Sequence, residues 1–123
     1  MLASYYLPIK LVSEMNNREC WQAKYRRSRS QKMAAKIITA SEFKWDGSPI
    51  IITIIREIGP RGKFFDSDND QASKKATRDG ITLGLGLTND NDSRLTWEYK
   101  QEKSDQHRVR VEINYTEKGK DNG

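Results

Sequence analysis

The chain has 123 residues, a length typical of one compact domain. Its 22 Lys and Arg residues outnumber its 17 Asp and Glu residues, and the net charge of +5 favours an anionic partner such as nucleic acid. No apolar run is long enough to span a membrane, and the single cysteine, Cys20, has no partner for an internal disulfide. We therefore expect a protein of the reducing cytoplasm without a membrane anchor.

The N-terminal third predicts one strand and one long helix. Ala3–Val12 is rich in Tyr, Leu, Ile and Val, and Pro8 within it indicates an edge strand or a bulge. Arg18–Phe43 contains neither Pro nor Gly, and its large apolar residues recur at about helical spacing. This stripe, which we expect to pack mostly into the core, consists of Trp21, Tyr25, Met33 and Ile37.

The middle of the chain predicts a buried strand followed by a second helix. After the turn signal Asp46–Pro49, the segment Ile50–Ile58 is nearly all β-branched, which is typical of a central strand buried on both faces. Gln71–Leu83 follows as a helix, with Asn69 or Asp68 as its expected N-cap.

Two segments with alternating apolar residues end the predicted fold. Leu95, Trp97 and Tyr99 share one face of the first, and Val109, Val111 and Ile113 share one face of the second, with Lys103–Gln106 as a hairpin loop between them. The order β-α-β-α-β-β predicts a single α/β (α+β) domain over residues 1–116, with two main helices on a mixed four-stranded sheet. Residues 117–123 are expected to form a disordered tail.

Aspartates near the second helix form a candidate metal site. Asp66 and Asp68 are two residues apart, which puts both carboxylates on one side of an extended chain. The loop with Asp90 and Asp92 follows the helix and can return towards them, with Lys75 alongside. Carboxylate oxygens suit Mg²⁺, which can activate water for phosphodiester hydrolysis, and a lysine can stabilise the charge on the phosphate. Alternatively, these aspartates only solubilise a turn and cap a helix.

The basic segment Lys24–Lys36 also allows two interpretations. Charge runs usually form a solvated helix face, but the same residues could follow the phosphates of DNA. We favour the second interpretation because of the acidic cluster, and the expected DNA contacts on this helix are Arg26, Arg27, Arg29 and Lys32.

Several motifs together resemble the RusA family of Holliday-junction resolvases, in particular its phage and prophage branch. The resemblance lies in Phe65–Ile81 (FDSDNDQASKKATRDGI), Leu85–Asp92 (LGLTNDND) and Leu95–Gln101 (LTWEYKQ), and it extends to Leu7–Ile9 (LPI) and Asn16–Trp21 (NNRECW) near the start. These segments occur in the same order over most of the chain, and this combination is much more specific than any one motif.

The resemblance implies a homodimeric enzyme that depends on Mg²⁺, or on Mn²⁺ in its place, and nicks four-way DNA junctions symmetrically in recombination and repair. The products would carry a 5′-phosphate and a 3′-hydroxyl. The essential aspartates of the family fall on Asp66, Asp68 and Asp90, which would bind the metal, with Asp92 as the fallback ligand. The family's lysine falls on Lys75, and further DNA contacts are expected from Lys63, Asn69 and Lys74, the neighbour of Lys75.

Three positions depart from the family pattern. Phe65 stands where some members have a basic residue, for which Lys63 or Arg61 could substitute. Asn89 stands where an aspartate is common, and Cys20 where a histidine is expected. These departures leave a second interpretation open, in which the chain is a weak or inactive homologue that binds DNA junctions.

Overall fold

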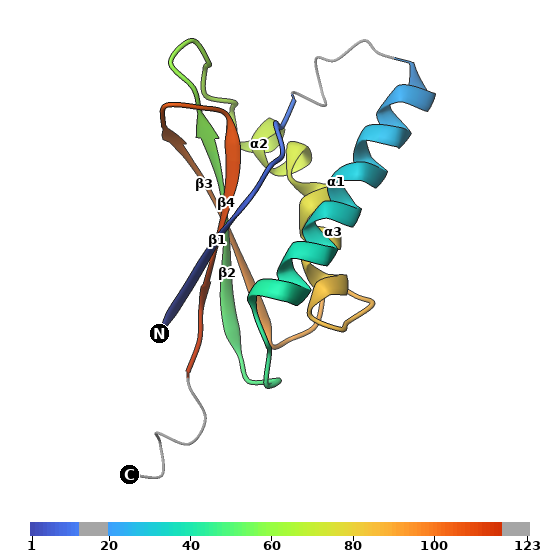
Figure 1. Cartoon of the computed structure of the whole chain (residues 1–123), viewed down its shortest axis with the longest axis vertical. Coiled ribbons are helices and arrows are strands. Elements are labelled where there is room, and N and C mark those ends of the chain that lie inside the picture. The colour runs from blue at the N-terminus through green and yellow to red at the C-terminus, as the bar shows by residue number, and fades with distance from the viewer. Residues whose placement is uncertain (13–19, 117–123) are drawn as a thin grey trace.

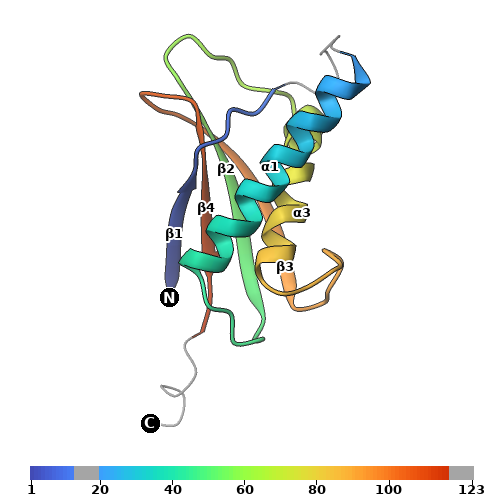
Figure 2. The ribbon, with the colours of Figure 1, turned by 45° about the vertical axis from the view of Figure 1, so that its right-hand side comes forward.

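Seven elements follow one another in the computed structural model, which describes residues 1–12 and 20–116. In chain order they are β1 Leu2–Leu7, α1 Trp21–Glu42, β2 Ile50–Ile58, α2 Ser67–Ser73, α3 Lys75–Gly84, β3 Leu95–Lys103 and β4 Arg108–Asn114. The helices cover one face of a four-stranded sheet, and no described element covers the other face (Figures 1 and 2). The predicted α+β class and the mixed sheet are confirmed.

The strand order in the sheet is β1-β4-β2-β3. β4 runs antiparallel to both of its neighbours, β1 and β2, whereas β2 and β3 are parallel, with registers from Ile50↔Leu95 to Ile58↔Lys103. The predicted hairpin at Lys103–Gln106 is therefore wrong, because β2 lies between the two strands that this connection joins. The apolar side chains of β4 are fully buried, which favours a position with a strand on each side. Trp97 and Tyr99 of β3 are only half-buried, which favours a position at the edge of the sheet.

The central strand was predicted with its bounds, Ile50–Ile58. The side chains of Ile52, Ile54 and Ile58 are fully buried, and only Ile51 is exposed among the nine residues. The first strand is shorter than predicted and ends at Leu7, since Pro8 has no N–H for the sheet. The expected turn is present, with Gly47 at φ +91° and the Asp46 carboxylate accepting hydrogen bonds from the backbone and hydroxyl of Ser48.

The expected orientation of α1 is wrong. Its predicted apolar stripe faces outward, and Trp21 is 73% and Ile37 60% exposed. The buried residues of the helix are Gln31, Ala35 and Thr39, which are small or polar. Large side chains cannot occupy that face, because α1 packs very closely on α3.

Two glycines of α3 cause this close packing. A Cβ atom on Gly80 would lie 2.3 Å from the carbonyl oxygen of Lys32 and 2.7 Å from Cβ of Ala35. A Cβ on Gly84 would lie 2.8 Å from both Lys36 O and Cβ of Thr39. The bare backbone of α3 therefore touches α1 directly, and the spacing Gly80–Gly84 places both glycines on one helix face.

The second predicted helix consists of two shorter ones. α2 ends at Ser73 and α3 begins at Lys75, and the N–H of Lys74 donates to Gln71 O in a tight i→i+3 turn. The N-cap is Asp66 rather than Asn69 or Asp68, since the Asp66 carboxylate accepts a hydrogen bond of 2.9 Å from the N–H of Asn69.

Two predictions fall on other parts of the chain. The expected tail 117–123 and the first residues of the expected helix, Arg18 and Glu19, lie outside the described residues. Within the described residues, no helix combines the length and apolar character that crossing a bilayer requires.

Candidate functional site

The N-terminal end of α2 presents two of the predicted metal ligands. Asp66 and Asp68 are both exposed at the start of the helix, where carboxylates interact favourably with the helix dipole. One oxygen of Asp66 accepts the capping hydrogen bond from Asn69, whose own side chain is buried. The structure therefore places Asp66 and Asp68 at the surface, whereas Asn69 is not accessible to a DNA backbone.

Lys74 and Lys75 point to different sides of the break between α2 and α3. Lys74 is fully buried against β3, where its Nζ lies 2.9 Å from the Asp70 carboxylate and 2.6 Å from the carbonyl of Lys100. Burial lowers the pKa of Lys74, and the hydrogen bond and charge of Asp70 oppose that shift. Lys75 is exposed and lines a hollow towards α1, so of the two lysines only Lys75 is accessible to a phosphate.

Asp90 lies at the other end of the helical pair and is attached to β3. Its carboxylate is 2.7 Å from Nε of Arg78, and its carbonyl accepts a hydrogen bond of 3.1 Å from the indole of Trp97. Arg78 also donates to the Tyr99 hydroxyl at 2.6 Å and stacks over the Trp97 ring. Asp90 is thus held by a network of Arg78, Trp97 and Tyr99.

The fallback ligand, Asp92, is paired with Arg94. Both of its oxygens accept hydrogen bonds of 2.9 Å from the Arg94 guanidinium, and one also accepts from the Arg94 N–H. These bonds lower the pKa of Asp92 to about 2. Asp92 therefore stays ionised at neutral pH, with both oxygens already engaged by its neighbour.

The predicted aspartates do not form one cluster within a chain. Asp66 and Asp68 lie at the start of α2, whereas Asp90 lies beyond the end of α3. Among residues 1–12 and 20–116, no three His, Cys, Asp or Glu side chains are grouped closely enough to hold a metal ion.

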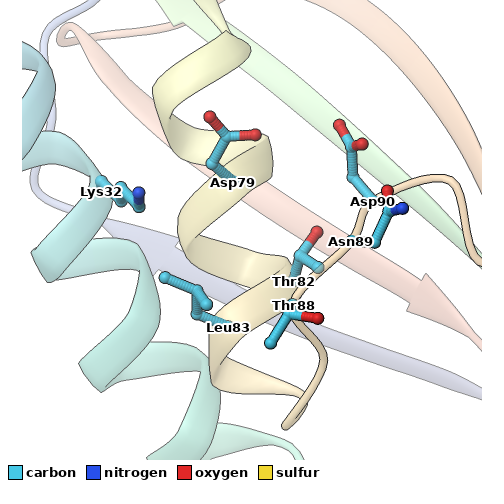
Figure 3. A pocket seen from close by; sticks show the side chains of 7 residues that line it. All are labelled: Lys32, Asp79, Thr82, Leu83, Thr88, Asn89 and Asp90. Atoms are coloured by element: carbon cyan, nitrogen blue, oxygen red, sulfur yellow. The ribbon is translucent and has the colours of Figure 1, made fainter.

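Asp90 and Asp79 both line a groove between α1 and α3, and Asp79 is not among the metal ligands predicted from the sequence. Figure 3 shows Asp79 on α3 between Lys32 of α1 and the loop of Asn89 and Asp90. This hollow has a volume of about 230 Å³, and Asp79 also lines the two adjoining hollows, which contain Lys24, Arg29 and Lys75. The groove therefore has an acidic centre with basic residues on its sides.

Most of the expected DNA contacts are at the surface of α1. Arg26, Arg29 and Lys32 are exposed, and Arg27 is half-buried. They share the helix with the exposed apolar stripe of Trp21, Tyr25, Met33 and Ile37, so the outward side of α1 is both basic and apolar.

A guanidinium lies beside Phe65, the position that departs from the family pattern. Arg56 stacks 3.5 Å from the centre of the Phe65 ring and donates to the carbonyl of Lys63 at 2.9 Å. Lys63 itself is exposed. This arrangement was not predicted, although Arg56 in the isoleucine-rich segment Ile50–Ile58 was a signal that this side chain needs a buried partner.

The open face of the sheet carries a second arrangement that was not predicted from the sequence. Glu57 is 3% exposed and is bonded by Arg108 at 2.6 Å and by Arg110, which also contacts Glu102 and Glu112. The available signal was Glu57 within an isoleucine-rich strand together with the alternating Arg108 and Arg110.

In a search for relatives, no family model and no curated protein matched this chain.

Proposed function

We propose that this protein is a Mg²⁺-dependent endodeoxyribonuclease that resolves four-way junctions by paired symmetric nicks. The observation that carries the proposal is the order Asp66/Asp68–Lys75–Asp90 in a net-basic chain, with both members of the first pair exposed at the surface. We place the activity in the cytoplasm, where the exposed thiol of Cys20 stays reduced.

The donor chemistry of Asp66 and Asp68 fits a hard cation. Mg²⁺ takes oxygen ligands and commonly binds one or two carboxylates while it keeps several waters. Asp66 and Asp68 provide such carboxylates, whereas Asp90 lies apart from them, beyond the end of α3. Bound there, the ion would neutralise charge on the phosphate and make water nucleophilic.

The protein's own residues would bind and orient the DNA. Arg26, Arg29 and Lys32 on the exposed side of α1 neutralise backbone phosphates, which supplies affinity without reading sequence. Lys75, at the start of α3, contacts the phosphate that is cut and stabilises its developing charge. Lys63, in the loop before α2, extends the basic contacts towards Asp66.

Cleavage of a synthetic four-way junction, with and without Mg²⁺ and beside linear duplex of the same sequence, tests this function. We expect paired nicks only on the junction and only with the metal, and Asp68→Asn should abolish them. Equal cutting of junction by Asp68→Asn and the unchanged protein would refute the assignment, and equal cutting of the linear duplex would refute the structural selectivity.

A second candidate function is junction binding without cleavage. The observation that favours it is the ion pair of 2.7 Å between Asp90 and Arg78, which neutralises a predicted ligand, together with Asn89 in place of an aspartate. Under this alternative, gel shifts in the absence of metal show tight binding to the junction, and added Mg²⁺ produces no nicks.

A further inference from the structure

One face of α1 combines two exposed aromatic rings with a row of cations. Trp21 is 73% and Tyr25 60% exposed, and they lie one helical turn apart. Arg29, Lys32 and Lys36 are also exposed, and their spacings of four and seven residues continue the same side of the helix. We call these five residues the aromatic–basic face of α1.

Trp21 and Tyr25 do not stabilise the described part of the fold. Within residues 1–12 and 20–116, Lys and Arg side chains stack on other aromatic rings but on neither of these two. Both rings lie outside the hydrophobic core, and with Met33 and Ile37 they put four large apolar side chains at the surface of one helix. Such a concentration of exposed apolar groups marks an interaction site.

The charge of α1 indicates the kind of partner. Glu42, the last residue of the helix, is its only acidic one. Its basic residues are Lys24, Arg26, Arg27, Arg29, Lys32 and Lys36. The partner must therefore be strongly anionic and must also offer flat apolar surfaces to the rings. A DNA strand meets both requirements, because it carries a phosphate at every nucleotide and every base has a π-face.

The spacing of the rings favours a single strand over a duplex. Four residues of helix correspond to a rise of about 6 Å, whereas the stacked bases of a duplex are about 3.4 Å apart along each strand. The faces of stacked bases are also covered by their neighbours, so protein side chains cannot reach them. Trp21 and Tyr25 can therefore stack only on bases that are unpaired and have left the stack.

A groove leads from the aromatic–basic face to Lys75. Tyr25 and Lys32 line a hollow of about 360 Å³ between α1 and α3, which shares Ser28 and Asp79 with the hollow that Lys75 lines. Figure 3 shows Lys32 extending from α1 towards Asp79 on α3. Because the Asp79 carboxylate repels phosphates, those of a bound strand belong on the outer side of the groove, at the cations of α1. The strand can then continue to Lys75.

We propose that the aromatic–basic face of α1 binds single-stranded DNA, with one unpaired base on Trp21, a second on Tyr25, and phosphates beside Arg29 and Lys32. This binding requires neither metal nor cleavage. Its consequence for substrate choice rests on the proposed nuclease function: the DNA that is cut would carry unpaired nucleotides beside the branch point, held by α1 while Lys75 contacts the phosphate.

Fluorescence anisotropy of a labelled oligothymidylate of about ten nucleotides, without Mg²⁺, tests the binding face. Trp21→Leu/Tyr25→Leu removes both rings but keeps apolar side chains, and its dissociation constant should rise about tenfold or more. Its affinity for a duplex of the same length, which depends on the phosphates alone, should not change. Two matched variants should bind the oligonucleotide like the unchanged protein. They are Trp21→Phe/Tyr25→Phe, which keeps two rings, and Met33→Ala/Ile37→Ala, which removes other exposed apolar groups from the same helix.

Two further measurements separate the rings from the cations. A base stacked on Trp21 quenches its fluorescence, so the oligonucleotide should quench the unchanged protein strongly and Trp21→Phe much less, although Trp21→Phe still binds. The remaining signal comes from Trp45 and Trp97, which are half-buried. Arg29→Ala/Lys32→Ala should reduce the slope of log affinity against log salt by about 1.4 for the single strand, whereas the leucine double variant should leave the slope unchanged.

Several results would overturn the binding face. Unchanged binding of the oligonucleotide by Trp21→Leu/Tyr25→Leu would exclude stacking, and so would an equal loss of affinity for single strand and duplex. Equal quenching in Trp21→Phe would place the bases on another tryptophan. Binding to vesicles of phosphatidylglycerol without binding to the oligonucleotide would assign the face to an anionic lipid surface instead.

Cleavage tests the consequence for the substrate. With Mg²⁺, a junction that has a short single-stranded gap beside its branch point should be cut about fivefold faster than a fully paired junction, and Trp21→Leu/Tyr25→Leu should remove this preference. If a protein that binds the oligonucleotide cuts both junctions equally, the substrate choice is wrong and the binding face stands. If it binds the oligonucleotide but cuts no DNA, the nuclease function alone fails.

Discussion

Buried charges fix the positions of single residues around the candidate site. Lys74, Arg56 and Glu57 are all buried, and each is bonded to oppositely charged or polar groups. A buried charge is tolerated only when its partners remain, so removal of one partner destabilises the fold much more than a surface substitution does. These residues position β3, α2 and the loop of Phe65, and none of them needs to touch DNA.

Substitution of the adjacent residues Lys74 and Lys75 directly tests the difference between a buried, paired charge and an exposed one. Lys74→Met should lower the free energy of unfolding by about 3–5 kcal/mol, because it leaves the Asp70 carboxylate buried without its cation. Lys75→Met, one residue further on at an exposed position, should change it by about 0.5 kcal/mol or less. Urea unfolding of both variants measures the effect, and equal stabilities would contradict the buried ion pair.

Glu57 should contribute a pH-dependent part of the stability. Burial raises the pKa of Glu57, but hydrogen bonds from Arg108, Ser104 and Arg110 outweigh it and lower the pKa below the ordinary 4.5. Its stabilising contribution is therefore complete above pH 4.5 and is lost as the pH falls through the lower folded-state pKa. The stability difference between the unchanged protein and Glu57→Gln should shrink as the pH falls below about 4.5. A stability difference that stays constant as the pH is lowered would refute the lowered pKa of Glu57.

At the scale of elements, apolar periodicity predicted the strands better than the long helix. Ile50–Ile58 had the correct bounds because a run of β-branched residues is compatible with only one environment, a strand in the centre of the sheet. The stripe on α1 was placed inside because large apolar residues usually face the core. The side of α1 that faces the interior is instead set by its contact with Gly80 and Gly84 of α3. These two residues belong to another helix, so the apolar periodicity of α1 contains no information about them.

Gly80→Ala should therefore destabilise the protein although alanine favours helices. The added methyl group meets Lys32 O and Ala35, and such overpacking costs about 1–3 kcal/mol, against which higher helix propensity offsets at most about 1 kcal/mol. Gly84→Ala should cost less, since its nearest atoms are 2.8 Å away rather than 2.3 Å. Thermal unfolding compares the two variants, and a stabilised Gly80→Ala would rule out the close helix contact.

The outward orientation of α1 predicts effects of different size on stability at two nearby positions. Met33→Lys should leave the stability within about 0.5 kcal/mol, because Met33 is 44% exposed. Ala35→Leu should destabilise by about 1–3 kcal/mol, because Ala35 is fully buried against α3. Chemical denaturation distinguishes the orientations, and the reverse ranking would restore the inward stripe that the sequence suggested.

At the scale of the whole molecule, the sequence predicted the class of fold and the sheet type, but not the strand order or the distribution of the aspartates. Local patterns locate strands, whereas the insertion of β2 between β3 and β4 depends on contacts between segments far apart in the chain. For the same reason, Asp66 and Asp90 belong to one sequence pattern, but in the structure Asp66 precedes α2 and Asp90 lies beyond the end of α3. The sequence shows Asp70, Lys74 and Asp79 only as charged residues at helical spacing. It does not show that Asp70 and Lys74 form a buried ion pair or that Asp79 lines a groove.

The net-basic surface should be measurable in the salt dependence of DNA binding. If Arg26 and Arg29 each neutralise one phosphate, the double variant Arg26→Ala/Arg29→Ala should reduce the slope of log affinity against log salt by about 1.8. Lys44→Ala, at an exposed position beyond the end of α1, is the matched control and should leave the slope unchanged. Titrations of labelled junction at several salt concentrations provide the slopes, and an equal reduction by all variants would contradict a track along α1.

The pairing of β1 with β4 has a consequence for how the chain folds during synthesis. Strand β1 has β4 as its only described partner, with Leu2 opposite Asn114, so the sheet cannot be completed until β4 has been synthesised. Such long-range pairing slows folding, because a large loop must close before its contacts stabilise it. Until then one side of the isoleucine-rich β2 has no partner, and the nascent chain is open to aggregation at that strand.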